Sequence, residues 1–141
     1  MTFPVPAPDA IPRPDPTGAD AVFWTALRDG ELKFERCGAC GTFRHPPKPV
    51  CARCGSAGSE WVASAGTGEV WSFTVIHAPT LPAFMDRVPY GAVVVRLDEG
   101  VFLVSNLLDC QVEELTVGDR VELVLTRVDD ELTLPLFRRT P

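Results

Sequence analysis

The chain has 141 residues, of which 45% are hydrophobic and 23% charged, so it is long enough for one large domain or two small ones and is not a wholly disordered chain. Its net charge of −6 argues against nucleic-acid binding, which depends on Lys and Arg neutralising phosphates. No apolar run approaches the roughly 20 residues of a membrane-spanning helix. The first ten residues lack the basic start and apolar middle of a signal peptide, so we expect a cytoplasmic protein.

Residues 1–19 are predicted to form a proline-rich N-terminal tail, because they hold six of the chain's 14 prolines. Proline fixes φ and has no N–H to donate, so this segment cannot be a helix or an inner strand. We expect an extended, polyproline-like segment that is either free or laid on a partner.

A short helix is predicted to follow the tail. Asp20 is a candidate N-cap, Phe23, Trp24 and Leu27 share one face, and Gly30 ends the helix. A helix of about ten residues is marginal in water, so this one must dock on something. The pattern does not distinguish docking on the rest of the chain from docking on a partner.

The cysteines between the helix and the later strands form two repeats. Cys37-Gly-Ala-Cys40-Gly and Cys51-Ala-Arg-Cys54-Gly lie ten residues apart, within a segment too rich in Cys, Pro and Gly to build an apolar core. Each turn aims two thiolates at one point, and the glycine that follows allows a left-handed backbone. The sequence therefore predicts one tetrahedral zinc ion per chain, held by Cys37, Cys40, Cys51 and Cys54. Four protein ligands leave no open position, so a structural zinc is favoured over redox iron or a redox dithiol.

From about residue 60 onward, apolar residues alternate with polar ones between turn signals, which predicts five or six strands and no long helix. Trp71, Phe73 and Val75 are expected on one face of their strand, and Glu99-Gly100 is expected to turn a hairpin. Such a set of strands is typical of a small closed barrel. The expected strands are residues 70–76, 90–98, 101–109, 120–128 and 132–137, with a short one near Trp61.

Charge is divided between these two parts. Residues 28–54 hold six basic and three acidic residues, a balance of +3, whereas residues 60–141 hold six basic and 13 acidic residues, a balance of −7. We call the cations around the cysteines the cationic ribbon group. They are either a surface for an anionic ligand or a partner, or else solvated side chains that offset a dianionic zinc–thiolate centre. The group comprises Arg36, Arg44, Lys48 and Arg53.

Few residues suggest catalysis by this chain. His45 lies in the ribbon loop and is expected to be solvated, while His77 ends a strand and is expected to be a packed or surface group. Cys110 has acidic neighbours that would raise its pKa, so it is expected to be buried or inert. No glycine-rich phosphate-binding loop, serine nucleophile elbow or His-Glu-x-x-His pattern is present in the sequence. We expect a non-catalytic subunit.

The chain resembles the zinc-ribbon OB-fold proteins of the "domain of unknown function 35" family over about residues 20–139. The features that carry the resemblance are FWTALRDGELKFERCGACGTFRHPPKPVCARCGS, then GTGEVWSFTVIH, Pro89-Tyr90, RLDEGVFLVSNLLD, LTVGDRVELVL and LPLF. A four-cysteine ribbon alone would be generic, but a ribbon followed by this set of barrel segments is specific.

The resemblance implies a mainly β protein with a helix and rubredoxin-like zinc ribbon at residues 20–58 and a five-stranded OB-fold barrel at residues 59–141. It also implies an accessory role beside a thiolase-superfamily enzyme, a thiolase or a thiolase-like aldolase, that acts on acyl-CoA in steroid or aromatic side-chain degradation. Two copies of each chain, with acyl-CoA at or near the shared interface, are expected. In that setting the cationic ribbon group is a candidate for contacting CoA phosphates or for docking on the partner. A nucleic-acid-binding OB-fold module and a stand-alone acyl-CoA-binding protein are the alternatives.

Overall fold

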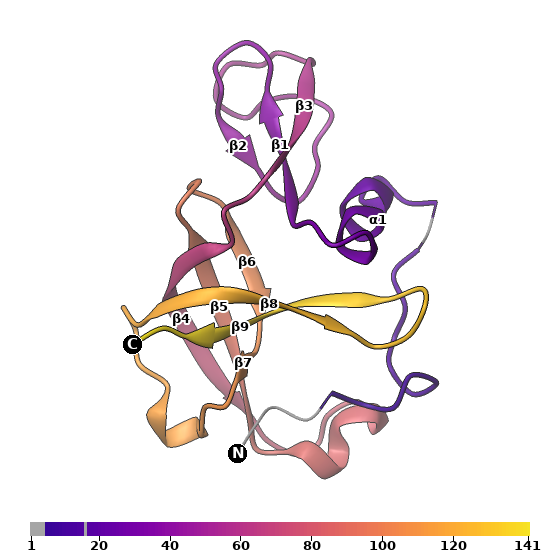
Figure 1. Cartoon of the computed structure of the whole chain (residues 1–141), viewed down its shortest axis with the longest axis vertical. Coiled ribbons are helices and arrows are strands. Elements are labelled where there is room, and N and C mark those ends of the chain that lie inside the picture. Colours follow the sequence, from indigo (N-terminus) through magenta and orange to yellow (C-terminus); the bar gives the residue numbers. More distant parts are fainter. Residues whose placement is uncertain (1–4, 16) are drawn as a thin grey trace.

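The protein is mainly β, with a short helix beside two sheets (Figure 1), in a computed structural model that describes residues 5–15 and 17–141. Within the described residues, no helix is both long enough and apolar enough to span a membrane. In chain order the elements are α1 (Ala21–Arg28), β1 (Lys33–Cys37), β2 (Phe43–Arg44), β3 (Ser59–Ala63), β4 (Thr67–Ile76), the 3₁₀ helix η1 (Pro82–Arg87), β5 (Tyr90–Leu97), β6 (Phe102–Ser105), β7 (Leu107–Leu108), the 3₁₀ helix η2 (Val112–Glu114), β8 (Arg120–Arg127) and β9 (Thr133–Arg139).

The first sheet belongs to the ribbon and has the strand order β2-β1-β3. The strand near Trp61, which the sequence placed in the barrel, is β3 of this sheet, and Trp61 pairs with Glu35 of β1. The barrel assignment was wrong because all five residues of β3 pair with the edge of β1 that β2 leaves free. The chain leaving the second cysteine pair returns antiparallel along the other edge of β1 and satisfies its backbone groups.

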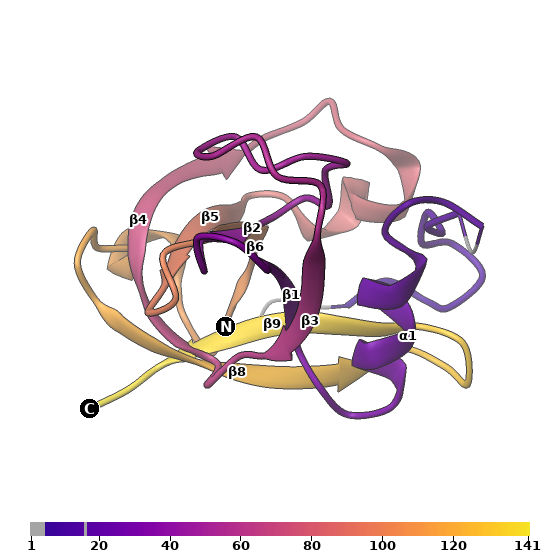
Figure 2. The same ribbon diagram turned by 90° about the horizontal axis from the view of Figure 1, so that it is seen from above.

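The second sheet has six strands in the order β6-β5-β4-β8-β9-β7. Only Asn106 separates β6, which pairs with β5, from β7, which pairs with β9, so the two ends of the sheet lie next to each other in the chain. Ser105 Oγ donates to the Pro135 carbonyl at 2.6 Å, and the Phe137 N–H donates to the Asn106 carbonyl at 3.1 Å. The sheet therefore curls into the predicted OB-fold, which is barrel-like in Figure 2. It has six strands and not five, because the strand expected at residues 101–109 breaks at Asn106, and the pairings among the described residues do not close the barrel.

A β-bulge corrects one detail of β4. The pairing with β5 shifts between Val70 and Ser72, so Trp71 is an extra residue in the strand. Phe73 then pairs with buried Val93 and lies on the same face of the sheet, although its side chain is still 38% exposed. Trp71 lies on the opposite face, 52% exposed beside Phe102, with ring centroids 5.0 Å apart. The expected single face for Trp71 and Phe73 was wrong because simple alternation cannot anticipate an inserted residue.

One hydrophobic core joins the helix, the base of the ribbon and the OB-fold. Phe23 and Leu27 of α1 and Phe34 of β1 are buried in the same cluster as Val70 of β4 and Phe137 of β9. The helix therefore docks on its own chain, between β1 and β9 (Figures 1 and 2). This resolves the open question about the partner of the helix.

The C-terminal end of α1 agrees with the prediction from the sequence, but the N-terminal end does not. Gly30 has φ 99° and donates to the Leu27 carbonyl at 3.1 Å, which ends the helix as expected. Asp20 makes no capping hydrogen bond with its side chain. Its carboxylate instead accepts from Trp24 Nε1 at 3.0 Å, because the indole lies one turn further along the same face.

The described part of the N-terminal segment packs against the rest of the chain. Pro6 is buried, and the Arg13 guanidinium pairs with Asp129, in the turn between β8 and β9, at 2.5 Å. Its described residues form no helix or strand, as the prolines predict. The segment is not extended throughout, however, because it turns at residues 8–10, and it is neither free nor left for a partner, because it packs on its own chain. Pro4 and Pro16 lie outside the described residues.

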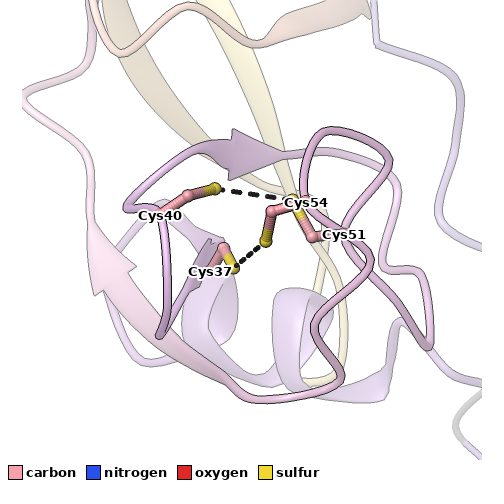
Figure 3. Close-up of side chains that lie close together, drawn as sticks. All are labelled: Cys37, Cys40, Cys51 and Cys54. Carbon is pink, nitrogen blue, oxygen red and sulfur yellow. Dashed lines mark hydrogen bonds between the residues drawn. The ribbon is translucent and has the colours of Figure 1, made fainter.

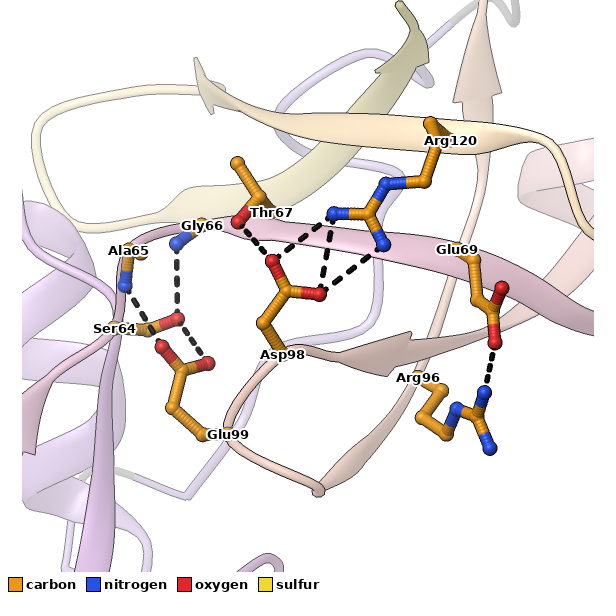
Figure 4. Close-up of polar contacts among 9 residues, drawn as sticks. All are labelled: Ser64, Ala65, Gly66, Thr67, Glu69, Arg96, Asp98, Glu99 and Arg120. Carbon is orange, nitrogen blue, oxygen red and sulfur yellow. Dashed lines mark hydrogen bonds and ion pairs between the residues drawn. The ribbon is translucent and has the colours of Figure 1, made fainter.

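The hairpin between β5 and β6 forms at Glu99-Gly100 as predicted, and it also anchors the ribbon (Figure 4). The Glu99 carboxylate accepts from Ser64 Oγ at 2.8 Å and from the Ala65 N–H at 2.9 Å. Residues 64 and 65 connect β3 of the ribbon to β4 of the OB-fold. The turn thus fixes where the ribbon leaves the barrel, a role that the sequence did not reveal.

Candidate functional site

The two cysteine motifs fold into matching turns. Gly41 and Gly55 have φ of 75° and 78°, and their N–H groups donate to the carbonyls of Cys37 and Cys51 at 3.0 and 2.8 Å. These are the left-handed glycines that the spacing predicted. The Arg53 N–H points at Cys51 Sγ from 3.4 Å, which is the arrangement that stabilises a thiolate.

The four sulfur atoms converge at the tip of the ribbon (Figure 3), and all lie within 4.8 Å of one another. The Sγ atoms are 3.6 Å apart for Cys37 and Cys54, and 3.7 Å apart for Cys40 and Cys51. A tetrahedron with Zn–S bonds of about 2.3 Å has edges of about 3.8 Å. The cluster is therefore suitable for one zinc ion.

Thiol acidity in this cluster shows why a cation is needed. The Thr42 hydroxyl and backbone N–H lower the pKa of Cys40 to about 6. The Ser56 N–H acts in the same direction on Cys54, but the neighbouring thiols and burial outweigh it and raise the pKa of Cys54 to about 11. Four thiolates this close repel one another, and a divalent cation between them removes the conflict.

The cationic ribbon group divides into two kinds of side chain. Arg44 is committed to a partner: its Nε donates to Glu35 Oε2 at 2.7 Å, and both side chains are nearly buried. This hydrogen bond raises the pKa of Arg44, and Cys51 and Cys37 contribute in the same direction. Arg44 thus lies near enough to the thiolates to offset part of their charge.

Arg36, Lys48 and Arg53 are exposed and differ from the other cations of the chain. Of the chain's 13 Lys and Arg residues, these three alone form no ion pair with any described residue. The Arg36 guanidinium lies 5.7 Å from the centre of the Phe43 ring and makes a cation–π contact with it. The unpaired positive charge of the molecule is therefore concentrated on the ribbon.

His45 is not the solvated loop histidine that the sequence favoured. Its ring packs on Phe23, at 4.8 Å between centroids, and on Phe34, at 5.4 Å. Burial lowers its pKa, although Asp20 acts in the opposite direction. The expectation failed because the ribbon loop folds back over α1, a contact between segments about 20 residues apart that local composition does not encode.

The other two candidates for chemistry are separated from the cysteines. His77 follows β4 and is exposed, a surface group as expected. Cys110 is half-buried, and burial raises its pKa, with Glu114 and Asp119 acting in the same direction and Arg139 opposing them. Glu114 thus acts as the sequence predicted, although burial is the larger cause and Asp119, further along the chain, was not anticipated.

Known proteins match both parts of this arrangement. Residues 24–60 match the family model described as the ChsH2 rubredoxin-like zinc ribbon domain, and residues 61–126 match the model of the ChsH2 C-terminal OB-fold domain. A "Probable enoyl-CoA hydratase alpha subunit" of Thermomonospora curvata is 42% identical over 90% of the chain and 39% of its own length. A "3-oxo-4,17-pregnadiene-20-carboxyl-CoA hydratase alpha subunit" of Mycobacterium tuberculosis is 36% identical over 79% of the chain and 35% of its own length. The chain thus spans little more than a third of these two relatives.

Two further matches cover most of the related protein. A "DUF35 domain-containing scaffold protein" of Methanothermobacter thermautotrophicus is 34% identical over 71% of the chain and 75% of its own length. A chain of the solved structure "Ltp2-ChsH2(DUF35) aldolase" superimposes with a TM-score of 0.81 at 42% identity, over 90% of this chain and 98% of that one. The chain therefore consists of a rubredoxin-like zinc ribbon followed by an OB-fold domain, and it belongs to the DUF35 family.

Proposed function

We propose that the chain is a non-catalytic accessory subunit of a thiolase-superfamily enzyme that acts on acyl-CoA in steroid or aromatic side-chain degradation. The observation that carries the proposal is the match to the chain of the Ltp2-ChsH2(DUF35) aldolase over 98% of that chain. The two longer relatives, named as CoA hydratase alpha subunits, support acyl-CoA as the substrate class. The family resemblance implies the thiolase-like partner and the two-plus-two assembly, and a cytoplasmic location is carried over from the sequence as part of the proposal.

In this proposal zinc has a structural role. Cys37, Cys40, Cys51 and Cys54 would hold it, and the zinc would supply a rigid cross-link between the two turns. The distances between their sulfur atoms support this ligand set. Four thiolates leave no position for water or substrate, so the chemistry of the complex belongs to the partner.

The unpaired cations suggest where the subunit meets negative charge. Arg36, Lys48 and Arg53 are proposed to contact CoA phosphates or a docking surface of the partner. Their lack of carboxylate partners supports this role, because an exposed cation that no carboxylate neutralises can still form a charge-assisted hydrogen bond with an anion. Among the described residues, Arg36 Nε donates only to the Gly41 carbonyl, at a long 3.4 Å. Arg44 is proposed to take part only through Glu35 and the ribbon.

The nucleic-acid alternative has less support. Every basic side chain of residues 60–141 is paired with a carboxylate, so few charges are free to neutralise phosphates. The pairs are Arg87–Asp86, Arg96–Glu69, Arg120–Asp98, Arg127–Asp130, Arg138–Glu122, and Arg139 with Glu114 and Asp119.

Co-expression with a thiolase-like enzyme from the same genome tests the proposal. We expect one complex with two copies of each chain, measured by size-exclusion chromatography with light scattering. Chains that never associate, under conditions where each is folded and the ribbon is zinc-loaded, would contradict the accessory role.

Single alanine variants of Arg36, Lys48 and Arg53 test the cationic contact within that complex. A charged hydrogen bond contributes roughly 1.5–3 kcal/mol, so loss of a phosphate contact should raise KM for acyl-CoA about tenfold or more. The matched control is Arg138→Ala, which removes an exposed arginine that is already paired on the OB-fold. Three zinc-loaded variants that assemble normally with unchanged KM would refute the cationic contact but leave the accessory role standing.

A further inference from the structure

A cavity of about 300 Å³ lies between α1, the ribbon loop and the OB-fold. Phe23 and Trp24 of α1 line one side of it, and Leu103, Leu134 and Leu136 of β6 and β9 line the other. These side chains come from three parts of the chain that meet at this place. The cavity is separate from the cysteine cluster and from the unpaired cations of the ribbon.

The size of the cavity sets the size of its ligand. Pockets for small molecules begin at about 300 Å³, and an apolar cavity of about 150 Å³ is enough to hold benzene. The present cavity is about twice that, so it suits two or three linked rings or an aliphatic group of similar volume. Apolar side chains, including prolines as well as aromatic and aliphatic residues, make up most of its walls, so an apolar ligand would gain free energy by leaving water.

Four polar side chains line the cavity, and two of them, Ser105 and Asn106, already donate to the carbonyls of Pro135 and Gly91. The other two set the chemistry of the ligand. The Asp20 carboxylate lines the cavity, and Trp24 Nε1 is its one donor among the described residues. His45 also lines the cavity, and its Nδ1 is buried without a hydrogen-bond partner in the part of the chain that the structure describes. A buried polar atom without a partner is costly and calls for an explanation. Both groups can accept a hydrogen bond, whereas the carboxylate would repel an anion.

We propose that this cavity is a binding site for an uncharged, largely apolar molecule that presents one N–H or O–H donor to Asp20. The negative charge of Asp20 excludes a carboxylate or phosphate at that end of the ligand. The site therefore differs in chemistry from the cationic surface of the ribbon. It does not rest on the proposed role in an acyl-CoA complex, since all its walls belong to this chain.

The probe for the test is N-phenyl-1-naphthylamine, a neutral molecule of suitable size with one N–H, whose fluorescence rises in apolar surroundings. Titration into the zinc-loaded full chain should give saturable binding of one equivalent. Its analogue 1-benzylnaphthalene, in which CH₂ replaces the N–H, should compete about tenfold less well. In Asp20→Asn, whose amide oxygen can still accept from Trp24, this preference for the N–H compound should fall to about twofold or less.

Two tryptophan variants locate the bound probe. Leu134→Trp fills the cavity and should weaken binding about tenfold or more, whereas Val117→Trp, at a position that is 60% exposed and does not line the cavity, should leave it unchanged. Zinc content and circular dichroism are checked first. If Leu134→Trp does not fold, Val104→Trp replaces it, because Val104 lines the cavity yet is 72% exposed. No saturable binding to the native chain, or equal binding by the filled and control variants, would overturn the proposal.

Discussion

Gly68 of β4 offers a sharp test of how the OB-fold strands pack. A Cβ at this position would overlap the Arg96 carbonyl oxygen of β5 and would lie 3.0 Å from both the Arg96 carbonyl carbon and Leu97 Cα. Non-bonded carbon atoms are most favourable at about 3.5–4.0 Å. The atoms in the way are backbone, so they cannot rotate aside, and Gly68→Ala must separate two paired strands. We expect a loss at the upper end of the usual overpacking range, about 3 kcal/mol in the free energy of unfolding.

Urea denaturation of the zinc-loaded chain measures this loss. With a slope of about 1–3 kcal/mol per molar urea, a loss of about 3 kcal/mol lowers the midpoint by roughly 1–3 M. Gly58→Ala is the matched control, because nothing lies within 4 Å of a Cβ there, and it should change stability by under about 1 kcal/mol. Equal midpoints for the two variants would show that β4 and β5 do not approach as closely as described.

Two further outcomes follow from the ribbon and the N-terminal segment. Cys51→Ser should abolish stoichiometric zinc binding, and protease should then cut residues 38–58 while the OB-fold stays protected, because few side chains of that segment are buried. Cys110→Ser is the control and should retain zinc. Loss of zinc from Cys110→Ser would refute the ligand set. The Arg13 hydrogen bond lowers the pKa of Asp129 from 3.8 to about 2, so its contribution to stability is present above about pH 4 and is lost as the pH falls towards 2. Arg13→Gln should raise the pKa of Asp129 part of the way, since the Glu131 and Leu132 N–H groups still donate to that carboxylate, and carboxyl NMR titration would show it.

The cysteine-rich segment between the helix and the barrel shows what can be predicted from local sequence alone. Two Cys-x-x-Cys-Gly motifs determine a four-thiolate cluster, because each motif closes its own turn and needs only a left-handed glycine to do so. The helix end at Gly30 and the hairpin at Glu99-Gly100 are local in the same sense, and both were predicted. The division of the chain at residues 19 and 58 stays a prediction. Residues of α1, β1 and the OB-fold share a single hydrophobic core, so the predicted parts do not have separate cores.

The sequence by itself determined the elements whose hydrogen bonds close within a few residues: the cysteine turns, the hairpin, the end of the helix and the alternation of most strands. Only the tertiary structure decided which edge β3 would pair with and how the bulge at Trp71 would turn that side chain outward. It also decided that His45 would be covered by Phe23 and Phe34, and that Asp20 would bind Trp24 and line a cavity instead of capping the helix. These outcomes depend on side chains and strand edges brought together from distant parts of the chain. Their free energies arise only when the whole core has formed, so no local pattern of residues encodes them.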